Sequence, residues 1–525
     1  MGDINILDCT LRDGGYCNEW LFGNQNIKKI ISGLVAANVD IIECGFLTNK
    51  AIYQPDVSKF TTLDEVATVI PENRVGKIFV CMMNYGEYRM EDLPPYDGTS
   101  LDGIRVAFHK KDLVGALEVC RQIKAKGYKV FIQAMVSLNY SDEEFLNLIQ
   151  ICNGFEPYAF YIVDSFGVMR RKDLMRLFYM VEHNLKESIY IGFHSHNNLQ
   201  LAYSNAQTLV DIRTKHDLVI DSSVFGMGRG AGNLNTELFV EYLNEHIQAR
   251  YDVKPLLTII DEILNDFYQR DYWGYSLPNY LSASHNAHPN YASYLDAKKT
   301  LTIENMNEIF AMMDEMKKTE FDKKYIEELY VRYMAKDVVQ EKNLTDFKTR
   351  IAGKRILIVA PGQSSNEEQV TIKDFSEQDD VVTIAVNFNY RGSKTDFIFL
   401  SNLRRFREIS PECYDKMIIT ANIPVIDTYL QVKYVDLLNH IEAVRDNATM
   451  MLIQYLIRMG VGEIYLAGLD GYSIDANKNF ADDRMSFVAQ KTVFEAMNQG
   501  MHDMLQEYSK HAHIQFLTSP RFVTL

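Results

Sequence analysis

The stretch Ile189-Tyr190-Ile191-Gly192-Phe193-His194-Ser195-His196-Asn197-Asn198 places two histidines at the end of an apolar run. Side chains two positions apart on a strand share one face, so His194 and His196 can direct their imidazole nitrogens at one point. Asp13 follows another apolar run, residues 4–7. One carboxylate and two imidazoles suit a catalytic divalent-metal site, which leaves positions open for water or substrate. The sequence therefore predicts that these three side chains converge on one metal ion.

Apolar, β-rich runs alternate with helical patterns over residues 1–250. The eight runs that we interpret as strands are Ile4-Leu7, Asp40-Cys44, Lys77-Cys81, Gly103-Ala107, Lys129-Met135, Ala159-Val163, Ser188-Phe193 and Leu218-Val224. The segments 27–37, 113–126, 142–152, 171–183, 199–211 and 235–247 carry apolar residues at the i, i+3, i+4 spacing of helices. This alternation predicts an α/β fold with a parallel sheet, and eight repeats are typical of a closed (β/α)8 TIM barrel.

A barrel of this kind gathers its functional groups at the carboxyl ends of its strands. The candidate residues at these ends are Asp13 after the first strand, Glu43 on the second, Arg105 on the fourth, Ser165 after the sixth, His194 and His196 at the seventh, and Gly228, Gly230 and Asn233 in the Gly-rich loop after the eighth. A loop so poor in side chains lets its backbone approach a ligand closely. We therefore expect one polar rim, with Ser165, Gly228 and Gly230 beside the substrate.

The rest of the chain predicts two further parts. Residues 251–350 read as a helical extension, a cap or oligomerisation region in which 303–317 and 323–336 are charged helices. At 353–525 the strand pattern restarts with Arg355-Ala360, Val381-Val386, Phe397-Leu400, Met417-Thr420 and Glu463-Ala467, with a helix at 449–459. This predicts a second, Rossmann-like doubly wound α/β domain, whose ligand would lie against the loop 361–365. The glycines there are too few for a dinucleotide fingerprint, so we predict only a nucleotide- or phosphate-binding fold.

Composition narrows the class of protein. The 525 residues carry a net charge of −16 and no long basic block, which argues against nucleic-acid binding. No stretch approaches the roughly 20 apolar residues of a membrane span, and the start lacks the pattern of a secretory signal. The seven cysteines form no CxxC pair, as expected of reduced thiols. We expect a cytoplasmic protein.

Three segments resemble the DRE-TIM metallolyase superfamily, and within it the 4-hydroxy-2-oxovalerate aldolases and 3-hydroxy-3-methylglutaryl-CoA lyases. They are Thr10-Leu11-Arg12-Asp13-Gly14, His194-Ser195-His196-Asn197-Asn198, and Gly230-Ala231-Gly232-Asn233-Leu234-Asn235-Thr236-Glu237. The resemblance covers about residues 1–300. It implies that Asp13, His194 and His196 bind Mg²⁺ or Mn²⁺ and that Asn233 adds a fourth ligand. It also implies that Arg12 holds the carbonyl or enolate oxygen, and Arg105 lies in a segment similar to the fourth strand of the aldolases.

One position departs from that family pattern. The family aldolases carry a catalytic histidine two residues after the glycine of the arginine-aspartate-glycine motif, where this chain has Tyr16. Tyr16 is the nearest candidate for the general base, although a phenol with a pKa of about 10 needs a cationic neighbour or a water relay. Further along, Ile464-Tyr465-Leu466-Ala467-Gly468-Leu469-Asp470-Gly471-Tyr472 is similar to bacterial sialyltransferase-like polysaccharide-biosynthesis proteins.

The leading hypothesis is a divalent-metal-dependent aldolase or lyase that forms or cleaves a bond between a pyruvate-type enolate and an aldehyde. The aldehyde could be sugar-linked, in polysaccharide biosynthesis, and a homo-oligomer is expected. One alternative is an acyl-CoA Claisen-type lyase or synthase. Another is a bifunctional protein whose carboxyl-terminal domain binds or transfers a nucleotide-sugar, and a non-catalytic barrel is the least favoured.

Several of these residues could instead have a purely structural role. Asp13 taken alone could be a helix cap. Glu43 could act directly or only orient Arg12, and the Gly-rich loop could be merely flexible. For His285 and His288, a solvated loop is favoured over metal ligation.

Overall fold

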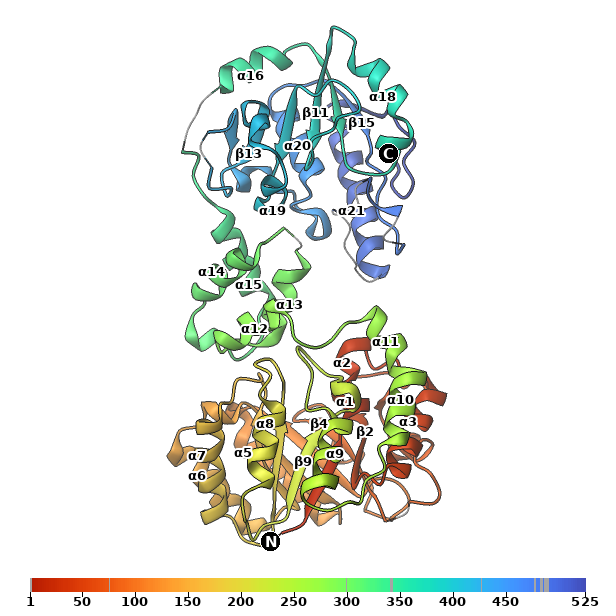
Figure 1. Ribbon diagram of the computed structural model, residues 1–525, viewed down its shortest axis with the longest axis vertical. Helices are drawn as coiled ribbons and strands as arrows, with labels where there is room; N and C mark the ends of the chain where they lie inside the picture. Colours follow the sequence, from red (N-terminus) through yellow and green to blue (C-terminus); the bar gives the residue numbers. More distant parts are fainter. Residues whose placement is uncertain are drawn as a thin grey trace. The chain divides into compact units, whose positions relative to one another are not determined.

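The computed structural model describes residues 2–525 except 75, 299, 340–342, 426, 476–477, 482–484 and 486–490. The chain folds into two compact units (Figure 1). The first comprises residues 1–294 and 313–321, and the second comprises residues 295–312 and 322–525. Residues 251–350, predicted as a helical extension, contribute helices to both units. The division into three domains at 1–250, 251–350 and 353–525 stays a prediction.

The first unit contains a closed parallel barrel. Its eight strands are β1 (Ile4–Asp8), β2 (Ile41–Leu47), β4 (Ile78–Asn84), β5 (Gly103–Phe108), β6 (Lys129–Ala134), β7 (Ala159–Asp164), β8 (Tyr190–Ser195) and β9 (Leu218–Ser222). β1 pairs with both β9 and β2, which closes the sheet. The predicted (β/α)8 TIM barrel is confirmed. A two-residue strand that the sequence did not predict, β3 (Lys59–Phe60), pairs with β2.

The helices of this unit follow, the last of which continues into the second unit. They are α1 (Thr10–Asp13), α2 (Gly15–Asn18), α3 (Asn24–Ala36), α4 (Leu63–Ala67), α5 (Leu113–Ala125), α6 (Asp142–Phe155), α7 (Arg171–Asn184), α8 (Ala202–Val210), α9 (Thr236–His246), α10 (Lys254–Ile259), α11 (Asn265–Arg270), α12 (Leu277–Ser284) and α13 (Pro289–Ala297). Figure 1 shows α5, α6 and α7 outside the strands. α6 illustrates why such a segment is helical, because the Ser141 hydroxyl accepts the N–H of Glu144 while the Glu144 carboxylate accepts the N–H of Ser141.

The barrel interior changes from apolar to polar along the strands. Leu7, Ile41, Val80, Phe131 and Val219 belong to one buried apolar cluster that also includes Tyr161. A Cβ at Gly192 would lie 2.3 Å from the Tyr161 ring, so only glycine leaves room for this ring inside the barrel. Glu43, His194 and Asp221 lie on the same strands, each two positions after residue 41, 192 or 219 respectively. A spacing of two keeps the same face, so these polar residues continue the inward rows toward the carboxyl ends.

The second unit is built on a seven-stranded parallel sheet. The strand order is β14 (Leu430–Val432), β13 (Met417–Thr420), β12 (Phe397–Leu400), β11 (Val381–Val386), β10 (Arg355–Val359), β15 (Glu463–Ala467), β16 (His513–Phe516). Its helices are α14 (Ile303–Ala311), α15 (Lys323–Met334), α16 (Leu344–Ile351), α17 (Ser364–Glu367), α18 (Gln369–Ser376), α19 (Leu403–Arg407), α20 (Ala448–Arg458) and α21 (Lys491–Tyr508). The chain proceeds outward from β10 on one side and then continues with β15 on the other. The predicted doubly wound domain is confirmed.

Some elements differ from the sequence prediction. The helix predicted at 303–317 ends at Ala311, and Asp314 then caps a separate short turn by accepting the N–H of Met316. β14 and β16 were not predicted. None of the helices in the described ranges is long and apolar enough to cross a membrane.

Candidate metal centre and active site

The structure brings Asp13, His194 and His196 together at the carboxyl ends of the barrel strands. Asp13 ends the single turn of α1, and the histidines lie at and just beyond the end of β8. One potential ligand atom of each residue lies within 4.8 Å of those of the other two. All three side chains are buried, and the two imidazole planes are perpendicular with centroids 5.1 Å apart. This arrangement matches the ligand set that the sequence predicted for a hard divalent cation.

Hydrogen bonds position the two histidines and leave a ring nitrogen of each available to a metal ion. Nδ1 of His194 lies 2.9 Å from Oδ2 of Asp221, a carboxylate that fixes the imidazole and leaves its Nε2 for a ligand. The backbone N–H of His196 donates to the Asp164 carbonyl oxygen, and Nδ1 of His196 is buried with no hydrogen-bond partner among the described residues. Burial lowers the pKa of His196 to about 3. A neutral imidazole keeps the lone pair that a metal ligand needs.

Asn233 completes the group. Its Nδ2 donates to Oδ2 of Asp13 at 2.5 Å, while its Oδ1 is buried without a hydrogen-bond partner in the part of the chain that the structure describes. Burial acts to raise the pKa of Asp13, but the charge of Arg12 and of the neighbouring basic groups outweighs it and lowers that pKa. The donor set of one carboxylate, two imidazoles and one amide oxygen fits Mg²⁺ or Mn²⁺.

A ladder of alternating charges supports this group from inside the barrel. Arg12 Nη1 lies 2.5 Å from Asp13 Oδ1, and Arg12 Nε lies 2.9 Å from Glu43 Oε2. Arg105 Nη1 lies 2.8 Å from the same Glu43 oxygen, and Arg105 Nη2 contacts Asp221 Oδ2. The ladder therefore runs from Asp13 through both arginines to the carboxylate that holds His194.

This ladder bears on the roles predicted for Glu43 and Arg105. Glu43 contacts both arginines and is 1% exposed, so the structure favours its role in orienting Arg12. Arg105 is 0% exposed and faces two carboxylates. Its Nε and Nη1 have no hydrogen-bond partner among the described residues, and its role as a direct substrate contact stays a prediction.

Residues 3–263 match the family model described as HMGL-like. The barrel is an HMGL-like domain. This confirms the resemblance to the DRE-TIM superfamily drawn from the three motif segments, and it places the domain among the lyases and aldolases. The similarity of residues 464–472 to sialyltransferase-like proteins stays a prediction.

Several known proteins are similar to this chain. A 4-hydroxy-2-oxovalerate aldolase of Geobacillus genomosp. 3 is 26% identical over 50% of this chain and 77% of its own length. An oxaloacetate decarboxylase of Mycobacterium tuberculosis is 25% identical over 46% of this chain and 71% of its own length. Among solved structures, the amino-terminal domain of a candidate aldolase from Bacteroides vulgatus is 27% identical, with a TM-score of 0.49, over 59% of this chain and all of that domain.

Tyr16 lies on α2 of the HMGL-like domain, beside the motif arginine and aspartate. Its ring is 40% exposed, and the Arg229 guanidinium lies 5.2 Å from the ring centroid. Burial around its hydroxyl raises the pKa of Tyr16, with Arg229 opposing the shift. The phenol is therefore protonated at neutral pH and serves as a hydrogen-bond donor more readily than as a base.

Ser165 and the Gly-rich loop line the same end of the HMGL-like domain. The Ser165 hydroxyl accepts the N–H of Val136 at 2.9 Å. Val136 has a φ of 53°, a strained conformation for a β-branched residue that fits a functional loop. A Cβ at Gly228 would lie 2.1 Å from Asn233 Nδ2 and 2.7 Å from Asp13 Oδ2, so glycine lets the loop lie against the ligands. Gly230 has a φ of 67°, which also favours glycine.

Sequence reasoning missed three residues of this site: Asp221, Arg229 and His288. The signal for Asp221 was a lone acid two positions after Val219 in an apolar strand run. Arg229 was the single charged residue in the Gly-rich loop. His288 belongs to a segment predicted as a solvated loop, but the structure half-buries it against Phe166, just after β7, with ring centroids 5.6 Å apart.

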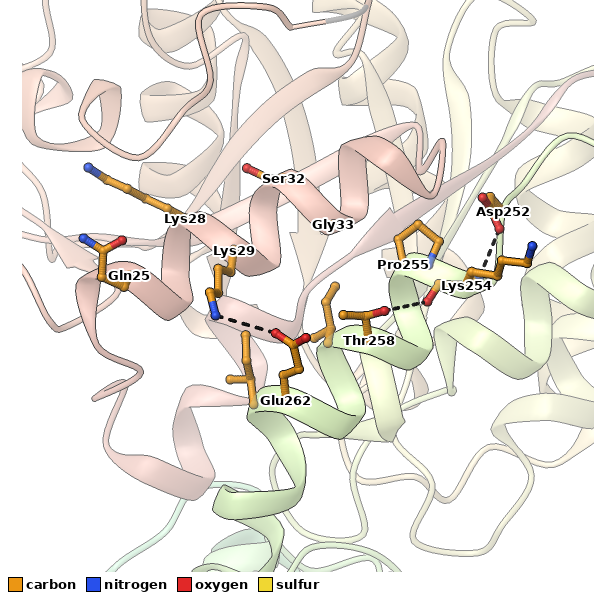
Figure 2. A pocket seen from close by; sticks show the side chains of 12 residues that line it. Gln25, Lys28, Lys29, Ser32, Gly33, Asp252, Lys254, Pro255, Thr258 and Glu262 are labelled. Carbon is orange, nitrogen blue, oxygen red and sulfur yellow. Dashed lines mark hydrogen bonds and ion pairs between the residues drawn. The ribbon is translucent and has the colours of Figure 1, made fainter.

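A separate groove lies on the outside of the HMGL-like domain, between α3 and α10 (Figure 2). Lys29 and Glu262 form an ion pair across it at 3.6 Å. Its lining includes none of the predicted site residues.

Proposed function

We propose that this protein is a divalent-metal-dependent aldolase or lyase that forms or cleaves a carbon–carbon bond between a pyruvate-type enolate and an aldehyde. The observation that supports it most directly is the convergence of Asp13, His194 and His196 beside the guanidinium of Arg12. Relatives named as 4-hydroxy-2-oxovalerate aldolases support the same reaction class. The named oxaloacetate decarboxylase is consistent with it, because loss of the 4-carboxylate of oxaloacetate also yields the pyruvate enolate.

Asp13, His194, His196 and the amide oxygen of Asn233 would hold the ion, Mn²⁺ or Mg²⁺. When bound, such a cation supplies electrostatic stabilisation of negative charge that develops on a 2-oxo acid. The remaining catalytic work falls to the side chains around it.

Arg12 is suited to hold the oxygen on which the enolate charge develops. Its Nε and Nη1 are fixed by Glu43 and Asp13, and its Nη2 is buried with no hydrogen-bond partner among the described residues. Burial alone would lower the pKa of Arg12, but the facing carboxylates raise it well above its ordinary value. A permanently charged, pre-oriented donor lowers the barrier because it needs no reorganisation as the charge forms.

Tyr16 is suited to manage the proton of the second substrate. In the direction of bond formation, the methylene carbon of the enolate joins the aldehyde carbon and the aldehyde oxygen becomes an alkoxide. The protonated Tyr16 hydroxyl then gives its proton to that alkoxide. Arg229 above the ring stabilises the resulting phenolate until solvent, which reaches the exposed part of the ring, restores the proton.

Exchange of the methyl protons of pyruvate with D₂O tests the proposal, because it reports enolisation without an aldehyde. The wild-type protein with Mn²⁺ is expected to exchange, and Asp13→Asn and His194→Gln are expected to lose exchange. Asp211→Asn serves as control, since Asp211 is an exposed carboxylate that accepts a hydrogen bond from Tyr242. Exchange that survives unchanged in Asp13→Asn would reject the proposal.

The acyl-CoA Claisen reaction is the alternative within the same superfamily. As a synthase it would release the free thiol of CoA, which a free-thiol assay detects, and as a lyase it would convert one acyl-CoA into a shorter acyl-CoA, which mass spectrometry detects. The pyruvate reaction predicts neither product, so these assays on the same protein separate the two chemistries.

For the second unit we propose binding of a nucleotide-sugar, which would suit a cytoplasmic, homo-oligomeric enzyme of polysaccharide biosynthesis. In doubly wound folds the ligand lies where the order of the strands reverses, which here is between the parallel neighbours β10 and β15. At this point a Cβ on Gly362 would lie 2.4 Å from the carbonyl oxygen of Gly468, so two backbone turns approach each other closely. Calorimetry of the full chain with CMP, UDP and GDP tests this, and no heat with any of them would exclude it.

A further inference from the structure

Arg229 differs from the other arginines at the mouth of the barrel. Arg12 and Arg105 each face two carboxylates at short distance. Arg229 forms no ion pair within the described ranges. Its Nη2 donates to the carbonyl oxygen of Ser165 at 3.3 Å, and its Nε is buried with no hydrogen-bond partner there. A half-buried guanidinium without a carboxylate is costly unless an anion pairs with it, so its environment favours a negatively charged ligand.

Arg229 is also close to the reacting centre. The preceding residue, Gly228, lies so near the metal ligands that a Cβ on it would come 2.7 Å from Oδ2 of Asp13. The Arg229 guanidinium lies over the ring of Tyr16, the proposed proton donor to the aldehyde oxygen. Arg12, not Arg229, is the arginine in contact with Asp13. The position of Arg229 therefore suits the aldehyde substrate better than the 2-oxo acid.

His288 adds a neutral donor on the same side. It precedes α13, and its Nδ1 accepts the N–H of Asn290 at 3.2 Å, which makes it the cap of that helix. This bond uses the Nδ1 lone pair, so the ring proton lies on Nε2. Its electrostatic neighbours include Arg229 and the metal-ligand candidate His196, and burial lowers the pKa of His288 to about 3. A histidine that stays neutral presents an N–H that can donate to an anion or a hydroxyl.

Resting on the proposed function, we propose that Arg229 and the Nε2–H of His288 bind an anionic group on the aldehyde, so that the second substrate is a carboxylated or phosphorylated aldehyde. The shared chemistry is an oxyanion several bonds from the reacting carbonyl. A guanidinium binds such a group through two parallel hydrogen bonds, and Nε2–H offers one more donor.

The test compares aldehydes with and without an anionic group. Glyceraldehyde is paired with glyceraldehyde 3-phosphate, and butanal with succinic semialdehyde, each with pyruvate and Mn²⁺. Wild type is expected to favour the charged member of at least one pair by about 10- to 100-fold in kcat/KM, the range of a charge-assisted contact. The pair that shows the preference identifies the anion as phosphate or carboxylate.

Variants of Arg229 and His288 show which of the two residues causes the preference for charged aldehydes. Arg229→Met is expected to lower kcat for all aldehydes, because Tyr16 loses its cationic neighbour, and to abolish the charge preference through KM, with at least tenfold more loss for charged than for neutral aldehydes. Arg229→Lys should retain part of it. His288→Asn can still cap the helix, so its expected smaller loss for charged aldehydes reports the missing Nε2–H. Lys29→Gln, in the outer groove, is the control for loss of a positive charge and should behave as wild type.

Three results would overturn the proposal. One is a wild type without preference for either charged aldehyde, and another is a preference that survives in Arg229→Met. The third is an equal loss for all aldehydes in Arg229→Met, which would assign Arg229 to Tyr16 alone. Exchange of the pyruvate methyl protons in wild type distinguishes the failure of this inference from the failure of the proposed function. If exchange is absent, the aldolase function itself is rejected. If exchange occurs but charged aldehydes are not preferred, only the anion site of Arg229 and His288 is rejected.

Discussion

Replacing Asp221 with Asn separates the contribution of the charge ladder to metal binding from its contribution to stability. Oδ2 of Asp221 contacts both Nδ1 of His194, at 2.9 Å, and Nη2 of Arg105. The carboxylate is ionised, because Arg105 and His194 outweigh the effect of burial and lower the pKa of Asp221. An asparagine keeps the shape but carries no charge, and its amide oxygen accepts more weakly from both partners.

Two magnitudes follow from these contacts. Loss of the carboxylate behind a ligating histidine weakens metal binding about 10- to 100-fold, because the imidazole is less well oriented and less basic. Removal of one partner of a buried ion pair costs about 3–5 kcal/mol of unfolding free energy. The value here should fall at the lower end of that range, because Arg105 keeps Glu43 at 2.8 Å.

Calorimetric titration with Mn²⁺ gives the first quantity, and urea unfolding of the metal-free protein gives the second. The double variant Arg105→Met/Asp221→Asn removes the charge that the single variant leaves unpaired. We expect it to regain stability while its affinity for Mn²⁺ stays low. Asp211→Asn again serves as the surface control.

An Asp221→Asn protein that binds Mn²⁺ as tightly as wild type would refute the positioning of His194 by Asp221. A double variant that regains affinity together with stability would also contradict the reasoning, because it would reduce the effect on metal binding to a general loosening of the fold.

Three further predictions address other parts of the barrel. Burial raises the pKa of Asp8 to about 6, so the stability this group contributes is complete below about pH 4 and is lost as the pH rises to about 6. Asp8→Asn should therefore gain up to about 3 kcal/mol over wild type between pH 4 and pH 7 in urea unfolding, and a pH-independent difference would contradict this. Gly228→Ala should weaken Mn²⁺ binding in calorimetry, because its Cβ would displace Asn233 and Asp13, and an unchanged Kd would argue against that close approach. Tyr16→Phe should retain pyruvate exchange but lose about 10²- to 10⁴-fold in aldol kcat, and equal losses in both assays would rule out a role confined to the aldehyde.

The barrel was predictable because its signals are local. Each strand is a short apolar run, and β2 is buried along its whole length, as in parallel sheets covered on both faces. The motif residues Asp13, His194 and His196 were predictable because strand ends meet at one rim of a barrel. Strands of two or three residues, such as β3 and β14, carry too little pattern to detect.

The partners across the barrel could not be predicted. Which acid faces Arg105 depends on the register and tilt of all the strands, and nothing in the neighbouring sequence indicates Glu43 or Asp221. His288 lies outside the strand-helix repeat, and its return to the rim next to Phe166 depends on how a helical segment folds back. Residue types in the Gly-rich loop indicated a close backbone approach, but not that Arg229 would lack a carboxylate.

The alternating row Asp13, Arg12, Glu43, Arg105 and Asp221 has a consequence for anyone who wishes to graft this centre onto another scaffold. If Asp13, His194 and His196 were copied onto a designed barrel with an apolar interior, no charged neighbours would fix the orientation of their side chains. The transplant would need four strands, β2, β5, β8 and β9, and the turn after β1, in their original stagger, since each member of the row is neutralised only by the next. The smallest portable unit of this centre is thus a large share of the barrel wall, not a short motif.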